Sequence, residues 1–93
     1  MQTSLDVALL AQRVHMSPRQ FNRRFQAAFG ATPTVYIELL RIETAKSQLE
    51  NTPKGLKQIA GDCGFASEEA MRRAFQRRLG VRPSAYRDRF APP

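Results

Sequence analysis

The sequence has a single cysteine and no long run of apolar residues, and these two absences exclude whole classes of protein. One cysteine forms no internal disulfide, which is typical of a protein from a reducing cytoplasm. No apolar stretch approaches the roughly 18 residues of a membrane span. The first residues, MQTSLDVALLAQRV, are too few and lack a basic start, so we expect no secretory signal. The sequence therefore predicts a cytoplasmic protein that does not span a membrane.

Acidic residues are also scarce. The 93 residues hold 15 Lys and Arg against 8 Asp and Glu, a net charge of +7. So large an excess on a chain long enough for one domain, or two very small ones, indicates a polyanionic partner. Nucleic acid is the first candidate, and an anionic membrane surface is the second.

The residue types that enzymes need are sparse too. The chain has one histidine and one cysteine, and it shows neither a glycine-rich phosphate loop nor a paired-acid motif. We therefore predict a protein that is not an enzyme, with no catalytic residue, no metal site and no cofactor. A sustained alternation of apolar and polar residues is absent as well, which predicts an all-α fold.

What the sequence does contain is an internal repeat. Residues 7–36 read VALLAQRVHMSPRQFNRRFQAAFGATPTVY, and residues 56–86 read LKQIAGDCGFASEEAMRRAFQRRLGVRPSAY. The offset is 49 residues up to the first turn and 50 from Ser17 and Ser67 onward. Apolar positions match apolar ones, and Gly30 matches Gly80. Two copies of one small helical unit are the simplest interpretation.

Each copy reads as a helix, a tight turn and a second helix. In the first copy, Ser17, Pro18 and Gln20 form a capping-box pattern that starts the second helix, and Gly30 ends it. The turns are expected at His15 and Gly64, where a positive φ is tolerated. The buried stripes are expected to be Phe21, Phe25 and Phe29 in the first copy, and Met71, Phe75 and Leu79 in the second. Cys63 is expected in the core.

A long helix from Thr32 to about Glu50 joins the copies, and residues 83–90 form a short last helix. We thus predict two helix-turn-helix subdomains of the homeodomain-like kind joined by a linker helix. The expected divisions are residues 1–31, 32–52 and 53–93.

The second helix of each copy carries the side chains that read DNA. A helix-turn-helix places its second helix, here about 17–29 and 67–79, in the major groove. The paired groups of Arg, Asn and Gln match guanine and adenine edges, and Glu accepts a hydrogen bond from cytosine. The predicted base-contacting residues are Arg19, Asn22, Arg23, Gln26, Glu69, Arg72, Arg73 and Gln76.

These motifs resemble the AraC/XylS family of bacterial transcription regulators. The most specific stretch is IAGDCGFASEEAMRRAFQRRLGVRPSAYR, from Ile59 to Arg87. The resemblance implies sequence-specific binding of a double-stranded DNA operator, with two recognition helices in successive major-groove segments. It also implies a location at the bacterial nucleoid and no membrane partner. Helix starts and nearby cations are expected to hold phosphates, because the first N–H groups of a helix lack partners. The predicted phosphate-contacting residues are Ser17, Lys54, Leu56, Lys57, Ser67 and Arg77.

The chain departs from the family pattern in three ways. Family members usually have another helix before the first unit and a separate sensor or dimerisation domain, so we expect a C-terminal part of a longer regulator that also contacts RNA polymerase. VHMSPRQFNRRF and MRRAFQRRLGV are similar to the subgroup whose sensor resembles class I glutamine amidotransferases. Glu68 and Glu69 place two acids at the start of the second recognition helix, where the family is often neutral.

Three alternatives stay open. In the first, the basic residues form a solvated helix face rather than a DNA contact, and the two acids only favour the positive helix start. In the second, the chain is a protein-interaction module. In the third, the chain binds RNA or a membrane surface through charge, without sequence preference.

Overall fold

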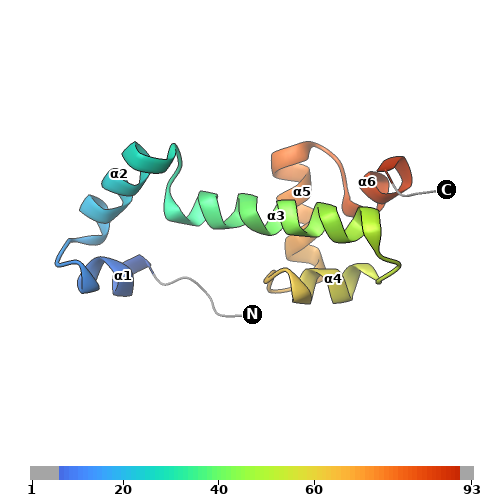
Figure 1. The fold of residues 1–93 in the computed structure, drawn as a ribbon, viewed down its shortest axis with the longest axis horizontal. Coiled ribbons are helices and arrows are strands. Elements are labelled where there is room, and N and C mark those ends of the chain that lie inside the picture. The colour runs from blue at the N-terminus through green and yellow to red at the C-terminus, as the bar shows by residue number, and fades with distance from the viewer. Residues whose placement is uncertain (1–6, 91–93) are drawn as a thin grey trace. The chain divides into compact units, whose positions relative to one another are not determined.

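The computed structural model describes residues 7–90, and all of its regular elements are helices. They are α1 (Val7–Arg13), α2 (Pro18–Phe29), α3 (Pro33–Asn51), α4 (Leu56–Asp62), α5 (Glu68–Leu79) and α6 (Pro83–Phe90) (Figure 1). The two helix-turn-helix pairs are α1–α2 and α4–α5, and the 19-residue α3 joins them. The predicted all-α class, with two such pairs and a long linker helix, is confirmed.

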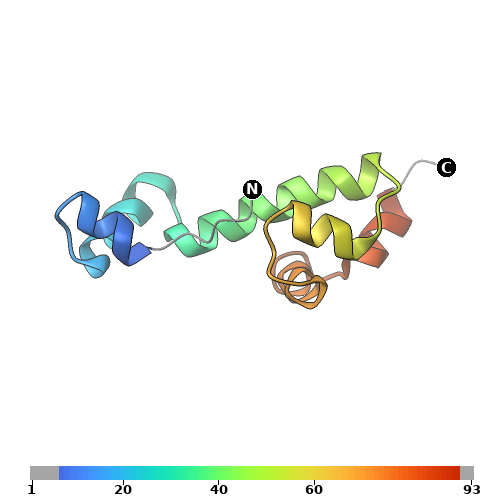
Figure 2. The ribbon, with the colours of Figure 1, turned by 90° about the horizontal axis from the view of Figure 1, so that it is seen from below.

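The described chain divides into two compact units, and the division falls inside α3. The N-terminal unit runs to Glu38, and the C-terminal unit begins at Leu39. The first unit therefore contains α1, α2 and the start of α3, while the second contains the rest of α3 with α4, α5 and α6. Figure 2 shows α5 nearly end-on beside α4 in the C-terminal unit. The domain limits drawn at 31/32 and 52/53 stay a prediction.

Both recognition helices begin and end as their sequences predict. The Ser17 hydroxyl accepts a hydrogen bond from the Gln20 amide at 3.1 Å, and the Gln20 side chain accepts one from the Ser17 amide at 3.1 Å, which completes the capping box. In α5, Ser67 accepts from the Ala70 amide at 3.0 Å. Gly30 and Gly80 end the helices with φ of 80° and 74°. These caps satisfy amides that helix termini leave without intrahelical partners.

The tight turn of each pair uses a left-handed backbone position. His15 has φ 59° and Gly64 has φ 92°. The left-handed region costs an ordinary side chain about 1–2 kcal/mol, a cost that glycine avoids. A Cβ atom at Gly64 would also lie 3.0 Å from Nε of Arg41. The two copies therefore form the same turn with different residues at the left-handed position.

We expect Gly64→Ala to lower the free energy of unfolding by roughly 1–2 kcal/mol, because it adds backbone strain and displaces Arg41. His15→Gly is the matched change in the other turn. It relieves the same strain but adds unfolded-state entropy, so its effect should be small or slightly stabilising. Urea unfolding of both variants tests this pair. Equal destabilisation by the two changes would show that the left-handed backbone position is not the source of the strain.

The core of the C-terminal unit lies between α3, α4 and α5. Phe75 and Ile59 are completely buried, and the second half of α3 covers them. Cys63 is buried in this core as predicted, and burial raises the pKa of its thiol. The cluster consists of Ile42, Ala45, Leu49, Ile59, Ala60, Cys63, Phe65, Met71, Ala74, Phe75 and Tyr86.

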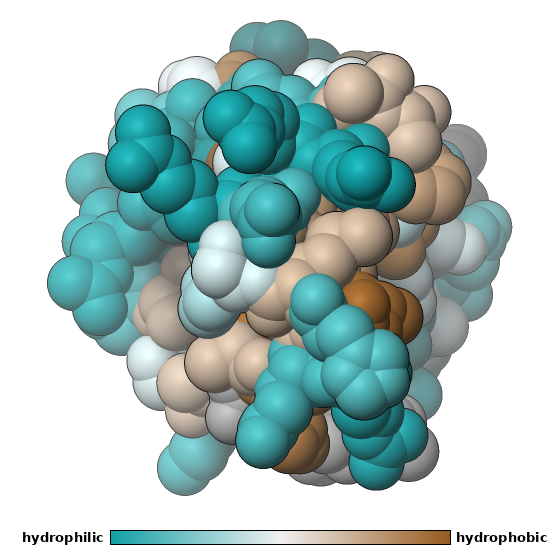
Figure 3. All heavy atoms as spheres, turned by 90° about the vertical axis from the view of Figure 1, so that its left-hand side faces the viewer, coloured by the Kyte–Doolittle hydropathy of each residue, from teal (hydrophilic) through white to brown (hydrophobic). Residues whose placement is uncertain are grey.

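The N-terminal unit is packed much less completely, and here the predicted buried stripe is wrong. Phe21 and Phe25 are only partly buried, and Phe29 is 58% exposed. Figure 3, which faces this unit, shows apolar atoms exposed among strongly hydrophilic side chains. In the C-terminal unit the second half of α3 covers the matched Met71 and Phe75, whereas the contacts of α2 with the start of α3 leave its phenylalanines half-buried or exposed. Leu79, also predicted to be buried, is 38% exposed near the end of α5.

Aromatic rings hold α2 to the start of α3 in place of a buried core. The ring centroids of Phe25 and Tyr36 lie 5.6 Å apart, edge to face, and those of Phe25 and Phe29 lie 4.5 Å apart. Such pairs add about 0.5–1.5 kcal/mol beyond the area they bury. The position of α2 within its unit therefore rests on a small aromatic cluster.

Tyr86 anchors α6 in the C-terminal unit, because its hydroxyl donates a hydrogen bond to Glu50 near the end of α3. Burial, followed by this contact with a carboxylate, raises the pKa of Tyr86 to about 12. A raised folded-state pKa stabilises the fold below the ordinary value of 10.0, and this contribution is lost as the pH rises towards 12. We therefore expect alkaline destabilisation within that window.

Phenolate absorbance of a Tyr36→Phe variant measures Tyr86 alone, since the chain has two tyrosines. Titration near the ordinary value while the fold is intact would refute the Glu50 contact. Glu50→Gln should lower the pKa of Tyr86, because it removes the negative charge.

Candidate nucleic-acid interface

The surface of α2 is basic and lacks acids. Arg19, Arg23 and Gln26 are exposed, and Asn22 is partly exposed beside them. They recur at helical spacing, so they share one side of the helix, away from the half-buried phenylalanines. The helix PRQFNRRFQAAF contains no Asp or Glu. The side chains predicted to contact bases in the first unit are thus gathered on one accessible surface.

The matched surface of α5 is organised differently, because its arginines contact an acid. Nε of Arg72 donates to Oε1 of Glu69 at 2.9 Å, and Nη2 of the same guanidinium donates to Oε2. Arg73 approaches the same carboxylate, with Nε 3.9 Å from Oε2. Hydrogen bonding to Arg72 holds the pKa of Glu69 below its ordinary 4.5 and raises that of Arg72. The spacing of Glu69 and Arg72 by three residues was the available sequence signal for this pair.

The remaining base-contact candidate of α5 also has a partner within the protein. The amide Nε2 of Gln76 donates to the carbonyl oxygen of Gly80 at 3.3 Å, at the end of its own helix. Arg73 keeps 63% of its side chain exposed. Arg73 is therefore more exposed than Glu69 and Arg72, whose side chains are 55% and 42% exposed.

The predicted phosphate-contacting residues are not equivalent. The hydroxyls of Ser17 and Ser67 are occupied as helix caps. At the start of α4, by contrast, Gly55 provides no side-chain cap for the amides that begin with Leu56. Lys57 is exposed beside these amides. Arg77 is exposed as well, but it lies on α5. Lys57 and Ser67 line one hollow, and Leu56 precedes Lys57 at the start of α4, whereas Ser17 caps α2 and Arg77 lies in the last turn of α5.

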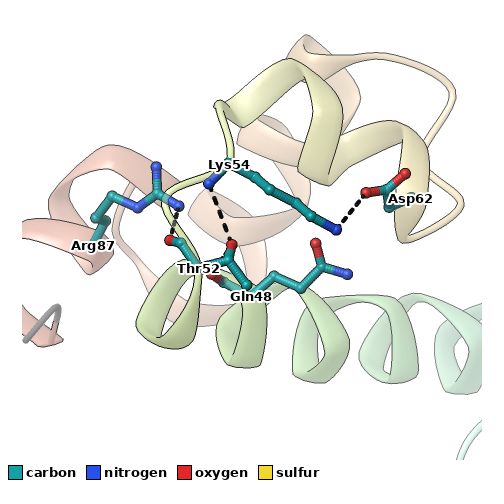
Figure 4. Close-up of polar contacts among 5 residues, drawn as sticks. All are labelled: Gln48, Thr52, Lys54, Asp62 and Arg87. Atoms are coloured by element: carbon teal, nitrogen blue, oxygen red, sulfur yellow. Dashed lines mark hydrogen bonds and ion pairs between the residues drawn. The ribbon is translucent and has the colours of Figure 1, made fainter.

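Lys54 contacts the protein itself. Its ammonium group forms an ion pair with Asp62 at 3.1 Å, from the loop before α4 to the end of that helix (Figure 4). The same loop is held by Arg87 of α6, whose Nη2 donates to the carbonyl oxygen of Thr52 at 3.1 Å. Thr52 in turn donates through Oγ1 to the carbonyl oxygen of Gln48 at 2.8 Å. This network fixes the loop that leads into α4.

A hollow of about 390 Å³ lies in the C-terminal unit where the starts of α4, α5 and α6 meet. Its walls include Leu56, Glu69, Arg72, Arg82 and Ser84. Arg82 and Ser84 were not among the predicted contacts, because Arg82 precedes the expected short last helix and Ser84 lies at its start, and neither belongs to a recognition helix. The hollow therefore joins predicted base and phosphate contacts with two residues that sequence reasoning missed.

Residues 7–90 contain neither a cluster of metal ligands nor a membrane-spanning helix. No three His, Cys, Asp or Glu side chains of this part of the chain lie together as metal ligands. No helix in the same range has the length and apolar character to cross a membrane.

Comparison with known proteins gives a consistent picture. The helix-turn-helix domain family matches residues 10–89. The HTH-type transcriptional regulator Rv1931c of Mycobacterium tuberculosis is 49% identical over 82 residues, which cover 88% of this chain and 32% of that protein. A putative AraC-like transcription regulator of Streptomyces lividans is 39% identical over 84 residues, covering 90% of this chain and 28% of that protein. The chain spans about a third of the length of the curated relatives it matches.

Solved structures share the fold. The DNA-binding domain of the transcriptional factor AdpA, crystallised with a target DNA, matches with a TM-score of 0.85 and 38% identity, over 96% of this chain and 80% of that one. The C-terminal domain of AraT, a response regulator of Geobacillus stearothermophilus, matches with a TM-score of 0.87 over 99% of this chain and 76% of that one. At 24% identity, the second match shows the fold alone. The chain belongs to the helix-turn-helix domain family, and its relatives include AraC-like transcription regulators.

Proposed function

We propose that this chain is the DNA-binding part of a transcription regulator and binds double-stranded DNA sequence-specifically. The observation that carries the proposal is the pair of helix-turn-helix units whose second helices expose Arg, Asn and Gln side chains. The likeness to AdpA, a protein crystallised on a target DNA, supports it. Binding of this kind requires no catalysis and no cofactor.

In this proposal α2 and α5 enter successive major-groove segments, as helix-turn-helix proteins do. The base-contacting set is Arg19, Asn22, Arg23 and Gln26 on α2, with Glu69, Arg72, Arg73 and Gln76 on α5. The phosphate-contacting set is Ser17, Lys54, Leu56, Lys57, Ser67 and Arg77. The exposure of Arg23, Arg73 and Lys57 supports these roles, while the internal ion pair of Lys54 makes it the weakest member.

We further propose that the chain acts within a longer cytoplasmic regulator. The relatives are about three times its length, which leaves room for a sensor or dimerisation domain. A sensor similar to class I glutamine amidotransferases is the specific form suggested by VHMSPRQFNRRF and MRRAFQRRLGV. RNA polymerase is the expected protein partner at the promoter, through surfaces outside the DNA grooves.

Selection of bound sequences from a random pool of duplexes tests the function. We expect one preferred sequence, and the logarithm of affinity should fall with the logarithm of salt concentration by roughly 0.9 for each neutralised phosphate. Steep salt dependence without sequence preference would indicate an unspecific polyanion binder. Absence of duplex binding at low salt would favour a protein-interaction module and refute the proposal.

A further inference from the structure

The two recognition helices differ most at one matched position. Arg19 of α2 corresponds to Glu69 of α5, so the first helix has an extra cation where the second has an anion. The difference is not confined to charge. The carboxylate of Glu69 accepts two hydrogen bonds from Arg72, whereas the residue matched to Arg72 in the first unit is Asn22.

The geometry of this contact leaves part of the arginine available. A guanidinium has five N–H donors in one plane. Glu69 uses the edge formed by Nε and Nη2 of Arg72. The other edge, formed by Nη1 and the second N–H of Nη2, has the two parallel donors that match O6 and N7 of guanine. Arg72 can therefore contact Glu69 and one guanine at the same time.

We propose that Glu69, in place of the direct base contact proposed above, is a positioning residue that holds Arg72 for guanine recognition and makes binding by the second unit more selective. This inference rests on the proposed DNA-binding function. The carboxylate restricts a long flexible side chain to one orientation, which lowers the entropy lost on contact with the base. Its charge also repels phosphates, so a duplex that offers no guanine to Arg72 gains less from the basic surface.

Glu68 provides a matched control. It precedes Glu69 in the first turn of α5, carries the same charge and is also exposed. Among the described residues, the carboxylate that pairs with Arg72 and Arg73 is that of Glu69. Glu68→Ala and Glu69→Ala therefore change the net charge equally, while only the second removes the support of Arg72.

The first measurement needs no DNA. In the free protein, the Nε–H proton of Arg72 should give a distinct, slowly exchanging NMR signal, because it is hydrogen-bonded to Glu69. Glu69→Ala should abolish this signal, and Glu68→Ala should preserve it. An Arg72 signal as rapidly exchanging as that of an unpaired arginine in wild-type protein would overturn the proposal without affecting the proposed function.

The second measurement compares affinities for the selected duplex, for an unrelated duplex and for each single-base variant. We expect Glu69→Ala to reduce the ratio of specific to unspecific affinity roughly 5- to 10-fold, with the loss concentrated at one G·C pair. Glu68→Ala should change both affinities alike. In an Arg72→Ala background, Glu69→Ala should have little further effect on base preference, since the two residues act as a unit.

Three outcomes would contradict the positioning role. If Glu69→Ala changes the preference at a cytosine, and does so in the Arg72→Ala background as well, then Glu69 contacts that base directly. Equal effects of the two alanine variants would reduce Glu69 to a general charge. A chain that prefers no sequence would overturn the proposed function together with this inference, although the NMR signal would still report whether Glu69 and Arg72 pair.

Discussion

Replacing Phe75 by alanine should lower the free energy of unfolding by about 3–5 kcal/mol, the usual cost of truncating a buried phenylalanine. Phe75 is completely buried on α5, and its ring lies 6.1 Å from that of Tyr86, edge to face. The cavity would open beside Ile42 and Leu49, which belong to a helix that also packs on α4. Because small domains have total stabilities of about 5–15 kcal/mol, a loss of this size is a large fraction of what the C-terminal unit can have.

The matched change in the N-terminal unit should behave differently. Phe25→Ala removes a ring that is only partly buried, so less apolar area returns to water and a smaller cavity is left. We expect a loss well below that of Phe75→Ala. Thermal and urea unfolding of both variants, followed by circular dichroism, measures the two costs. Equal costs, or a Phe75 variant with the wild-type midpoint, would show that the two cores have been placed wrongly.

DNA binding should follow stability in these variants. Neither phenylalanine is predicted to touch a base, so any loss of affinity should arise through unfolding of the recognition helix. Binding that recovers on cooling, together with the helical signal, would support this reading. A folded Phe75 variant that fails to bind would instead assign the ring a direct role.

The repeat and the helix limits could be predicted from sequence because local chemistry decides them. Ser17 and Ser67 start helices by capping amides, Gly30 and Gly80 end them, and Gly64 marks a turn. These interactions join residues within a few positions of each other. The matched halves reinforce the interpretation, since each turn signal occurs twice.

Burial in the N-terminal unit could not be predicted in the same way. The repeat assigned Phe25 and Phe75 the same environment, yet burial depends on whether another helix covers the ring. The second half of α3 provides that cover for Phe75, whereas Tyr36 at the start of α3 lies against Phe29 and still leaves it 58% exposed. The Glu69–Arg72 contact was not predicted either, because a sequence of mixed charges does not say which carboxylate pairs with which arginine. Which side chains read DNA stays a prediction.

The matched arginines Arg23 and Arg73 carry the second large prediction. Each lies six residues after its capping serine and two before the matched phenylalanine, about 200° round the helix at 100° per residue, so both face away from the core. Both are exposed, and neither fills a hydrophobic contact. Alanine at either position should change the free energy of unfolding by less than about 0.5 kcal/mol. Effects on binding can then be assigned to the DNA contact.

Arg23→Ala and Arg73→Ala should each weaken binding to the preferred duplex by about 1–3 kcal/mol if the side chain forms a bidentate contact with guanine. Such a contact also relaxes the preference at one base pair. A phosphate contact weakens binding to all duplexes alike and lowers the salt slope by about one. We expect base reading from at least one of the two, with its base pair roughly one helical turn, about 10 base pairs, from the segment read by the other unit.

Arg23 and Arg73 differ in one respect that sharpens the test. The Nε atom of Arg73 lies 3.9 Å from Glu69, whereas α2 contains no acid that would hold Arg23. A neighbouring carboxylate restricts an arginine and offsets part of its charge, so Arg73→Ala should alter the salt slope less than Arg23→Ala. Affinities of both variants for single-base operator variants, at two or more salt concentrations, separate the roles. Uniform losses at both positions would make the arginines positioning contacts, and unchanged affinity at both would refute the groove-facing assignment of α2 and α5.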